Sequence, residues 1–298
     1  MPERVEVAVV GATGFLGRSL VPALRTAGAQ VATYTRSIPF LDADGRAAPG
    51  LAGAGTVFWL ATGANPQTAE QQPDRVVADH TAFRGLLHAV QELTPAPTVV
   101  LLSSGGTVYD PAASPPYDES SPTRPVSAYG AGKLALEELL AREAPGRQVA
   151  VRVSNAYGPG QPVASGQGVI AHWLRAAQCG QPVRLFGDPS TTRDYVFVQD
   201  IVRALVAVAG HSSHLPPVLN VGSGRPTTLA ELAETVLAVV ADPSLQRLVE
   251  PARSFDVART WLDVGLARDL LGWTPQTALP DGIAAAWDAI RRDAIPSR

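Results

Sequence analysis

A glycine-rich turn near the start of the chain is the feature that most restricts its fold. The motif is Gly11-Ala12-Thr13-Gly14-Phe15-Leu16-Gly17, which follows the apolar run 5–10 and precedes an apolar-periodic stretch that ends at Gly28. The first glycine permits a tight turn, the second lets the backbone approach a ligand, and the third permits close packing of helix against sheet. A pyrophosphate bound there meets the N–H groups at a helix N-terminus. The strand–turn–helix context therefore predicts dinucleotide binding.

Strand-like and helical patterns alternate along the first half of the chain. Apolar runs occupy 31–35, 56–61, 98–104 and 148–154, and helical periodicity occupies 74–93 and 128–143. This alternation predicts an α/β protein with a Rossmann-type doubly wound parallel sheet. After about Asn155 short elements are separated by turn signals, which indicates a smaller C-terminal substrate-binding lobe. We expect residues 1–155 to form the NAD(P)-binding domain and 156–298 to form mainly that lobe, with segments near 190–222 returning to the first domain.

Net charge, cysteine and histidine content and the lengths of apolar runs argue against several classes of function. A net charge of -3 without a block of basic residues argues against a nucleic-acid partner. Cys179 is the only cysteine, and the five histidines lack metal-ligand spacing, so neither a disulfide framework nor a metal is expected. We see no signal peptide and no run of about 18 apolar residues, so we expect a cytoplasmic protein without membrane association.

The end of the second strand-like run bears on the choice of cofactor. NAD-binding proteins commonly place an Asp or Glu there to hold the ribose 2′-hydroxyl. This chain has Thr35-Arg36-Ser37 instead. An arginine and two hydroxyls suit a 2′-phosphate better, which favours NADP (NADPH), with NAD as the alternative.

Together the motifs resemble the extended short-chain dehydrogenase/reductase family, in its nucleotide-sugar epimerase/dehydratase branch. The resemblance covers nearly the whole chain, with GATGFLG, VFWLA, LLSSGGTVYD, YGAGK, VRVSNAYGPGQ, TTRDYVFVQD, NVGSG and PARSFDV in the order of the family. It implies cofactor contacts from Gly11, Thr13, Gly14, Phe15, Leu16, Gly17, Arg36, Asp42, Leu60, Ala61, Ser103, Tyr129 and Lys133.

The same resemblance makes Tyr129 the acid/base and Lys133 its helper. Residues four apart share a helix face, and an adjacent ammonium would lower the pKa of the phenol. The hydroxyl residue that the family usually places before this helix is replaced by Gly105. Thr107 and Ser104 are the nearby hydroxyls, and we choose Thr107 as the third catalytic residue.

The resemblance also implies a nucleotide diphosphate-sugar substrate, with a dTDP or UDP nucleotide. Arginines suit the diphosphate because their planar fork offers paired donors. Ser254 stands where the family usually has proline, a small departure. The residues implied to contact the substrate are Ser104, Gly105, Thr107, Asn155, Leu185, Phe186, Arg193, Arg253 and Asp256.

Three functions stay open. The first is a 4-ketoreductase that uses NADPH on a nucleotide-linked 4-keto sugar, often a 6-deoxy one. The second is a 4-epimerase with tightly held NAD, and the third is a catalytically silent NADP-binding sensor or scaffold. Dehydratases of this family resemble one another in an Asp-Glu pair, and this chain has Gly106-Thr107 there, which argues against elimination of water.

The family commonly forms homodimers through the helix that carries the Tyr-Lys pair and its neighbour. Leu134, Leu136, Leu139 and Leu140, together with apolar positions of 74–93, could supply such a face. They could equally belong to the core of the chain itself.

Overall fold

A six-stranded parallel sheet forms the centre of the larger part of the molecule. The structure, a computed structural model, describes residues 6–163, 168–250 and 258–293. The strand order is β2-β1-β3-β4-β5-β9, and every neighbouring pair is parallel. The strands are β1 (Glu6–Val10), β2 (Gln30–Tyr34), β3 (Thr56–Trp59), β4 (Thr98–Ser104), β5 (Gln148–Val153) and β9 (Val218–Val221). The doubly wound fold expected from the sequence is confirmed.

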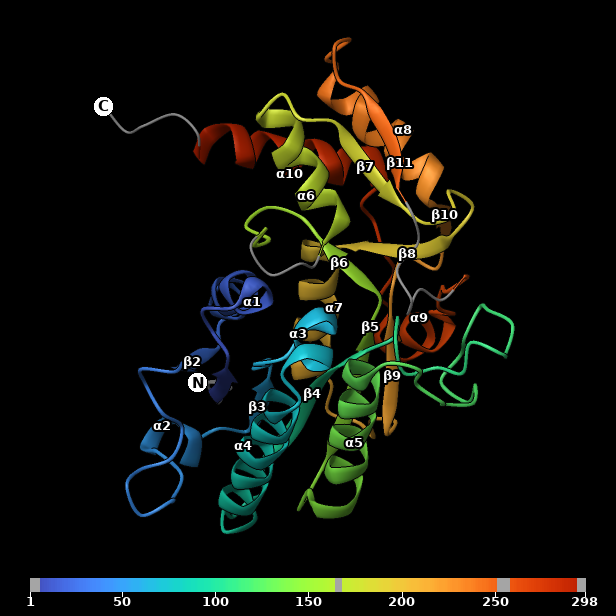
Figure 1. Ribbon diagram of the computed structural model, residues 1–298. Coiled ribbons are helices and arrows are strands. Elements are labelled where there is room, and N and C mark those ends of the chain that lie inside the picture. The colour runs from blue at the N-terminus through green and yellow to red at the C-terminus, as the bar shows by residue number, and fades with distance from the viewer. Residues whose placement is uncertain (1–5, 164–167, 251–257, 294–298) are drawn as a thin grey trace.

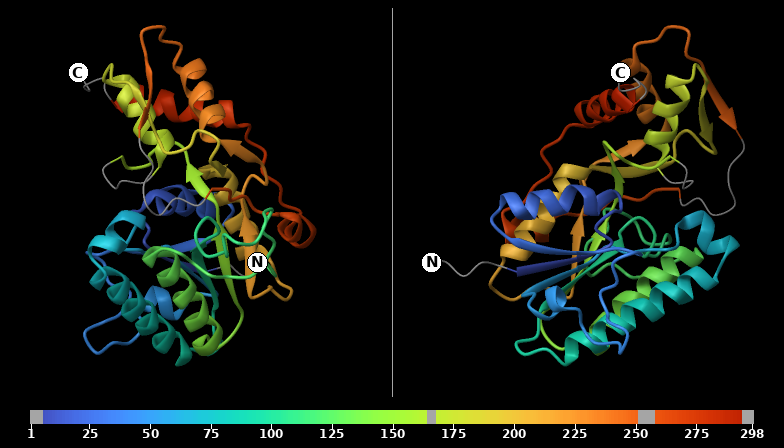
Figure 2. Two further views of the ribbon diagram at one scale, coloured as in Figure 1. Left: turned by 45° about the vertical axis from the view of Figure 1, so that its right-hand side comes forward. Right: turned by 90° about the vertical axis from the view of Figure 1, so that its left-hand side faces the viewer.

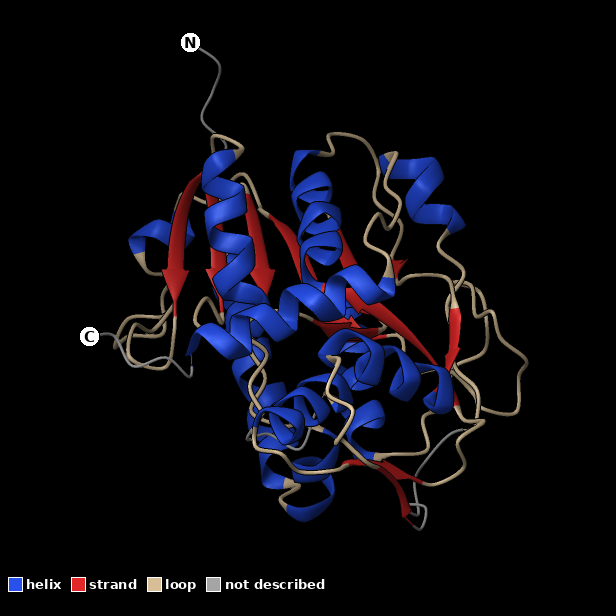
Figure 3. Cartoon of the chain, turned by 90° about the horizontal axis from the view of Figure 1, so that it is seen from above, coloured by secondary structure: helices blue, strands red, loops and turns tan. Residues whose placement is uncertain are grey.

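Helices cover both faces of this sheet (Figures 2 and 3). On one face lie α1 (Phe15–Thr26) and α7 (Val198–Gly210), whose apolar residues share one core cluster. On the other face lie α2 (Pro49–Ala52), α4 (Asp74–Gln91) and α5 (Ala128–Glu143), with α3 (Pro66–Gln71) beside α5. The inner strands β3, β4 and β5 are mostly apolar because both of their faces are buried, whereas the edge strand β2 is only partly buried. Winding reverses on either side of β1, and ligands bind such sheets at the carboxyl ends of the strands near that point.

Most of the remaining elements form a smaller lobe above the sheet (Figure 1). A three-stranded sheet of β6 (Asn155–Tyr157), β8 (Thr192–Phe197) and β10 (Pro226–Thr228) adjoins a two-stranded one of β7 (Val183–Phe186) and β11 (Arg247–Glu250). The helices of this lobe are α6 (Val169–Gln178), α8 (Leu229–Val240) and α10 (Leu279–Asp293), whereas α9 (Gly265–Leu271) packs beside β9 and α7 of the larger part. Within 190–222, α7 and β9 pack on the large sheet, whereas β8 belongs to the small one. The domain boundary near residue 155 stays a prediction.

Asp194 joins the two parts of the molecule. Its fully buried carboxylate accepts hydrogen bonds from the Ser154 hydroxyl at 3.0 Å and from the Ser223 N–H at 2.7 Å. The N–H groups of Gly224 and Leu262 donate to the same carboxylate at 3.2 and 3.3 Å. Burial raises the pKa of Asp194. The carboxylate ties β8 to the end of β5 and to the loop after β9, and so it fixes the floor between the lobes.

The leucines considered for a dimer face belong to the chain itself. Leu136, Leu139 and Leu140 are buried in the same core cluster as Phe83 and Leu86 of α4. Leu134 packs against a small cluster around Tyr109 and Tyr117. Leu136, Leu139 and Leu140 therefore provide no dimer surface, whereas Leu134 is half-buried, and the homodimer stays a prediction. No helix in the described part of the chain is long and apolar enough to cross a membrane.

Candidate active site

The glycine turn is built for close approach of backbone segments. Gly11 has φ +92°, and a Cβ there would lie 2.7 Å from the N atom of Ala61. A Cβ on Gly17 would collide with the backbone of Gly11 and Ala12. Gly14 is the N-cap of α1, and no side chain caps that helix within the described residues. The first-turn N–H groups of α1 are thus available to a pyrophosphate, so the residues present fit a dinucleotide.

A single large cleft runs from this turn to the smaller lobe. Its volume is about 2060 Å³. One ligand-sized pocket is usually about 300–1,000 Å³, so the cleft has room for a dinucleotide and a second ligand. The residues chosen from the sequence that line the cleft are Gly11, Thr13, Gly14, Phe15, Leu16, Gly17, Arg36, Leu60, Ala61, Ser103, Ser104, Thr107, Tyr129, Asn155, Phe186 and Arg193.

Tyr129 and Lys133 lie one turn apart at the start of α5. The hydroxyl of Ser127 accepts a hydrogen bond from the N–H of Gly130 at 3.1 Å, which caps the helix. Tyr129 reaches the cleft. Lys133 is 6% exposed and lies behind it, where its Nζ donates to the carbonyl of Leu102 at 3.3 Å. That Nζ is 5.6 Å from the centroid of the Tyr129 ring, over its face.

The electrostatics of this pair differ from the sequence expectation. Burial and the negative charge of Asp79 raise the pKa of Tyr129 above its ordinary value, whereas a lowered pKa was expected. Burial lowers the pKa of Lys133 to about 8, and the charges of Asp79 and Glu137 oppose that fall. The expectation counted only the ammonium and omitted burial and a carboxylate from α4, neither of which the local motif contains.

Thr107 and Ser104, the two candidates for the third catalytic group, line the cleft, whereas Gly105 does not. Gly105 is buried, and a Cβ there would lie 2.6 Å from Cδ1 of Leu262, so a side chain at this position would point away from the cleft. Thr107 lines the cleft, and its buried Oγ1 has no hydrogen-bond partner among the described residues. Its carbonyl lies against Gly130, next to Tyr129. A buried hydroxyl without a partner is costly unless a ligand supplies one, which favours Thr107.

The turn after β2 presents Arg36 to the cleft. The hydroxyl of Thr35 accepts hydrogen bonds from the N–H groups of Ser37 and Ile38, each at 3.2 Å. This closes a short turn that leaves the exposed side chain of Arg36 at the rim.

Comparison with known proteins assigns the family. The model of the NAD dependent epimerase/dehydratase family matches residues 7–222. The chain belongs to this family. It is an NAD(P)-dependent enzyme of the extended short-chain dehydrogenase/reductase type.

Relatives in the family have names that give different activities. A dTDP-6-deoxy-L-talose 4-dehydrogenase (NAD(P)(+)) of Kitasatospora kifunensis is 32% identical over 310 residues, which cover 95% of each chain. A dTDP-4-dehydro-6-deoxyglucose reductase of Escherichia coli is 30% identical over 79% of this chain and 75% of its own length. A UDP-glucose 4-epimerase of Mycolicibacterium smegmatis is 38% identical over 65% of this chain, and the match spans 62% of that protein, less than two thirds.

Solved structures of the family share the whole fold. UDP-glucose 4-epimerase of Thermotoga maritima, solved with UDP-glucose, has a TM-score of 0.85 at 25% identity and covers 96% of this chain and 99% of its own. The UDP-glucose 4-epimerase of Thermus thermophilus, solved as a complex with NAD, has a TM-score of 0.82 at 27% identity, covering 97% and 99%.

Besides Lys133, three of the family residues inferred from the sequence lie outside the lining of the cleft. Asp42 is outside the cleft, where its carboxylate accepts from the N–H groups of Asp44 and Arg46 in a surface turn. Leu185 is 1% exposed in the core, because side chains alternate along β7 and this one points inward. Gly105 faces Leu262, as described above.

Ser103, by contrast, lines the cleft as expected for a cofactor contact, and its role stays a prediction. Its buried hydroxyl donates to the carboxylate of Glu137. Two further positions, Arg253 and Asp256, lie outside the described residues.

The smaller lobe contributes the other wall of the cleft. Phe186 is 41% exposed at the end of β7, and Arg184, two residues earlier, shares its face. The Nδ2 of Asn155 donates to the carbonyl of Asp194 at 3.0 Å, which holds the asparagine beside Arg193. Because side chains alternate along β7, Arg184 and not Leu185 shares the face of Phe186. The sequence would have indicated this only if the face that Phe186 occupies had been known.

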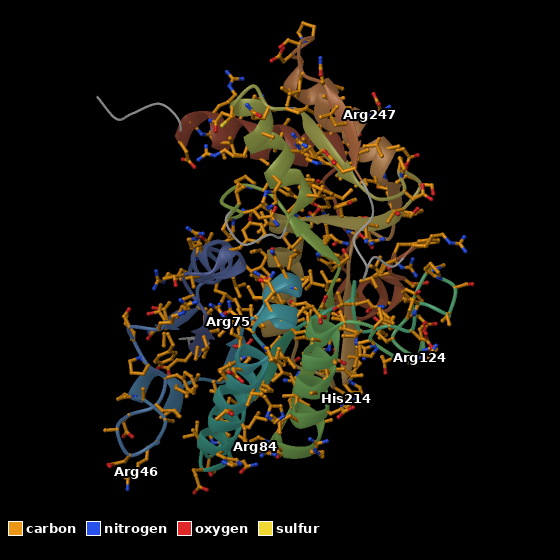
Figure 4. All side chains as sticks on the ribbon, viewed as in Figure 1. Arg46, Arg75, Arg84, Arg124, His214 and Arg247 are labelled. Atoms are coloured by element: carbon orange, nitrogen blue, oxygen red, sulfur yellow. The ribbon has the colours of Figure 1, made fainter. Side chains whose placement is uncertain are left out.

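Several residues that line the cleft were not identified from the sequence. Thr62 and Gly63 follow β3, and Arg75 and Asp79 come from α4. Arg75, labelled in Figure 4, donates to the carbonyl of Gly63 at 3.0 Å. No motif in the sequence indicates that these residues line a cleft, since only the packing of α4 against the loop after β3 brings them there.

Lys133 did carry an unused signal, because it is the only lysine among 24 basic residues. Every other Lys/Arg position is an arginine, and the two side chains are not interchangeable where a compact ammonium is needed.

The described residues contain no group of three or more His, Cys, Asp or Glu that could hold a metal ion. His214, for example, is exposed in a surface loop (Figure 4).

Proposed function

We propose that this enzyme is an NADPH-dependent 4-ketoreductase that acts on a dTDP- or UDP-linked 4-keto sugar, such as a 6-deoxy one. The observation that carries the proposal is the turn after β2, where Arg36 lies at the cleft and residues 35–38 contain no carboxylate. A guanidinium suits a 2′-phosphate, and NADPH is the usual reductant that is consumed in such reactions. The relative from Kitasatospora kifunensis, which matches over 95% of each chain, is named as a 4-dehydrogenase that uses NAD(P)(+).

The proposed reaction reduces a ketone to a secondary alcohol. The nicotinamide, when bound, supplies the hydride to C4 of the sugar. Tyr129, at the cleft, donates its phenolic proton to the keto oxygen as the hydroxyl forms. Thr107 donates its unpaired hydroxyl to the same oxygen and orients the carbonyl. Lys133, behind the ring, supplies the positive charge that stabilises the phenolate left on Tyr129.

The sugar nucleotide is proposed to occupy the half of the cleft nearer the smaller lobe. Asn155 and Arg193 lie there, and the exposed ring of Phe186 offers a surface for the pyrimidine. Arg253 and Asp256 complete this set in the proposal, on the strength of the family motif alone. Residues 1–155 with part of 190–222 would then hold the cofactor, and most of 156–298 the sugar nucleotide.

A second candidate is a nucleotide-sugar 4-epimerase with tightly held NAD. The mycobacterial relative with 38% identity is a UDP-glucose 4-epimerase, and structural neighbours of that name cover 96–97% of this chain. The same Tyr129 would then take a proton from the C4 hydroxyl and later return it.

One experiment separates the two functions. The purified enzyme is incubated with UDP- and dTDP-sugars and with their 4-keto forms, with and without NADPH. Loss of reduced-nicotinamide absorbance with the 4-keto forms, and an alcohol product by NMR, is expected for the ketoreductase. Cofactor that stays with the protein through gel filtration, together with interconversion of C4 epimers without added NADPH, would instead establish the epimerase.

Arg36→Ala tests the choice of cofactor. We expect the Kd of NADPH to rise about 10- to 100-fold, since a charge-assisted hydrogen bond contributes about 1.5–3 kcal/mol. The Kd of NADH should change less than about threefold, because NADH has no 2′-phosphate. Fluorescence titration of both nucleotides gives the values. Arg46→Ala is the control, because Arg46 is an exposed arginine of the following loop that lies outside the cleft (Figure 4). Equal losses for NADPH and NADH would remove the cofactor argument.

Thr107→Val tests the third catalytic group. The substitution keeps the shape and removes the hydroxyl, so we expect kcat to fall about 10- to 100-fold, the cost of one hydrogen bond to a developing charge. Ser104→Ala, at the last residue of β4 and also at the cleft, is the matched comparison and should cost less than about threefold. Steady-state kinetics of both variants side by side give the answer, and the reverse order would transfer the role to Ser104.

A further inference from the structure

Asp79 occupies a position between the cofactor side of the cleft and the Tyr-Lys pair. It lies on α4, which packs on α5. Its carboxylate accepts hydrogen bonds from the N–H of Gly63 at 2.7 Å, the N–H of Ala64 at 3.2 Å and the hydroxyl of Thr62 at 3.1 Å. These hydrogen bonds fix the loop after β3, which lines the cleft, and they also fix the position of the Asp79 carboxylate.

A small cavity connects Asp79 with the pair. Its volume is about 10 Å³, and Asp79, Tyr129 and Lys133 all line it. This is at the lower limit for a single water molecule. Tyr129 and Lys133 therefore face Asp79 across a gap with room for at most about one water molecule, while Asp79 itself is half-buried at the open cleft.

Other charged groups near the pair are already partnered or lie at the surface. Glu137, one turn further along α5, is in a buried ion pair with Arg152 of β5. Glu70 of α3 is exposed and accepts from the N–H of Ala128 at 2.7 Å. Asp79, by contrast, forms no ion pair with an arginine in the ranges that the structure describes. Its negative charge is the one that faces Tyr129 and Lys133 without an arginine to offset it.

We propose that Asp79 is a positioning residue that keeps the Tyr129–Lys133 pair protonated near neutral pH, the state in which Tyr129 can donate a proton to a keto oxygen. This inference rests on the proposed role of the pair in the reaction. A carboxylate nearby stabilises the ammonium of Lys133 and destabilises the phenolate of Tyr129. Burial alone would act oppositely on Lys133, since it lowers the pKa of the ammonium, and the charge of Asp79 limits that fall.

The pKa of Lys133 can be measured directly, without substrate or cofactor. Because Lys133 is the only lysine, protein labelled with ¹³C-lysine gives one side-chain resonance whose shift with pH reports this group alone. In the full chain with a lysine-free tag, Asp79→Asn should lower the Lys133 pKa by about one unit, since a neighbouring opposite charge is removed. Asp79→Ser removes the same charge with a smaller polar group and should give a shift of the same sign.

Thr62→Val is the matched control for a merely structural role. It removes one hydrogen bond to Asp79 from the loop but leaves the carboxylate charged. We expect the Lys133 pKa to stay within about 0.3 units of the wild-type value, because the charge that acts on it remains. An unchanged pKa in Asp79→Asn and Asp79→Ser, or an equal shift in Thr62→Val, would overturn the proposal.

The pH profile of turnover provides a second readout. Ketone reduction requires the protonated pair, so the alkaline limb of kcat should move to lower pH in Asp79→Asn and stay in place in Thr62→Val. A reduced kcat with an unmoved limb would mean that Asp79 only shapes the loop. If the enzyme proves not to reduce 4-keto sugars, the proposed function fails, while the lysine titration still decides whether Asp79 controls the pair.

Discussion

Tyr129→Phe is expected to lower kcat of the proposed reduction by about 10²- to 10⁴-fold, the usual contribution of a positioned general acid. The phenol is the proton donor that α5 places at the cleft, and its ring is held over Lys133. Phenylalanine keeps the ring and its packing but has no proton to give. Cofactor affinity should change less than about threefold, because most binding contacts of a dinucleotide come from the glycine turn and the first helix.

Tyr157→Phe is a suitable control for this loss. Tyr157 also borders the cleft, but it is 2% exposed and its hydroxyl donates a weak 3.5 Å hydrogen bond to the carbonyl of Leu279. This variant should retain turnover within about fivefold, since it loses only a long hydrogen bond. Steady-state kinetics and nucleotide titration on both variants give the comparison. Turnover that survives in Tyr129→Phe would reject the role assigned to the phenol under either proposed function.

Glu137→Gln is expected to lower the free energy of unfolding by about 3–5 kcal/mol, the cost of leaving one member of a buried ion pair alone. The carboxylate of Glu137 accepts from Nε of Arg152 at 3.1 Å and from its Nη2 at 2.6 Å. Both side chains are nearly inaccessible, at 5% and 6% exposure. The guanidinium also lies over the Tyr109 ring at 4.7 Å, and its low exposure leaves it little access to water when its partner is neutral.

Glu138→Gln, the next residue on the same helix, is the control. Glu138 pairs with Arg142 at 3.8 Å, with both side chains about 60% exposed. An exposed pair of this kind contributes little, so a change below about 0.5 kcal/mol is expected. Urea unfolding of the two variants, with the midpoint compared at equal m-value, measures the difference. A cost for Glu137→Gln as small as that for Glu138→Gln would show that solvent reaches Arg152.

Much of the fold could be predicted because its signals are local. The run 98–104 became β4 (Thr98–Ser104), and the helix expected at 128–143 is α5 (Ala128–Glu143). Strands buried on both faces are continuous apolar runs, and the glycine turn needs the absence of Cβ atoms at Gly11 and Gly17. Such requirements involve neighbours in the chain, and so they are visible in the sequence.

Side-chain direction was less predictable in the smaller lobe. Leu185 and Phe186 were both assigned to the substrate, but strand geometry sends adjacent side chains to opposite faces, so only Phe186 reaches the cleft. A shift of one residue in register reverses the assignment, and nothing in the four-residue strand sets its register. Asp42 lies outside the cleft for another reason, since its carboxylate accepts from the N–H groups of Asp44 and Arg46 within its own surface turn.

By itself, the sequence determined the alternation of strands and helices in the first half of the chain, the glycine turn, and the placement of Tyr129 and Lys133 on one face of a helix, because each depends on spacing along the chain. Only the tertiary structure decided the electrostatic setting of that pair. Asp79 comes from α4, 50 residues before Tyr129 in the chain, and the packing of α4 on α5 brings its carboxylate to the same cavity. Charge and burial act through space, so the pKa of a phenol or an ammonium depends on neighbours that no local motif contains.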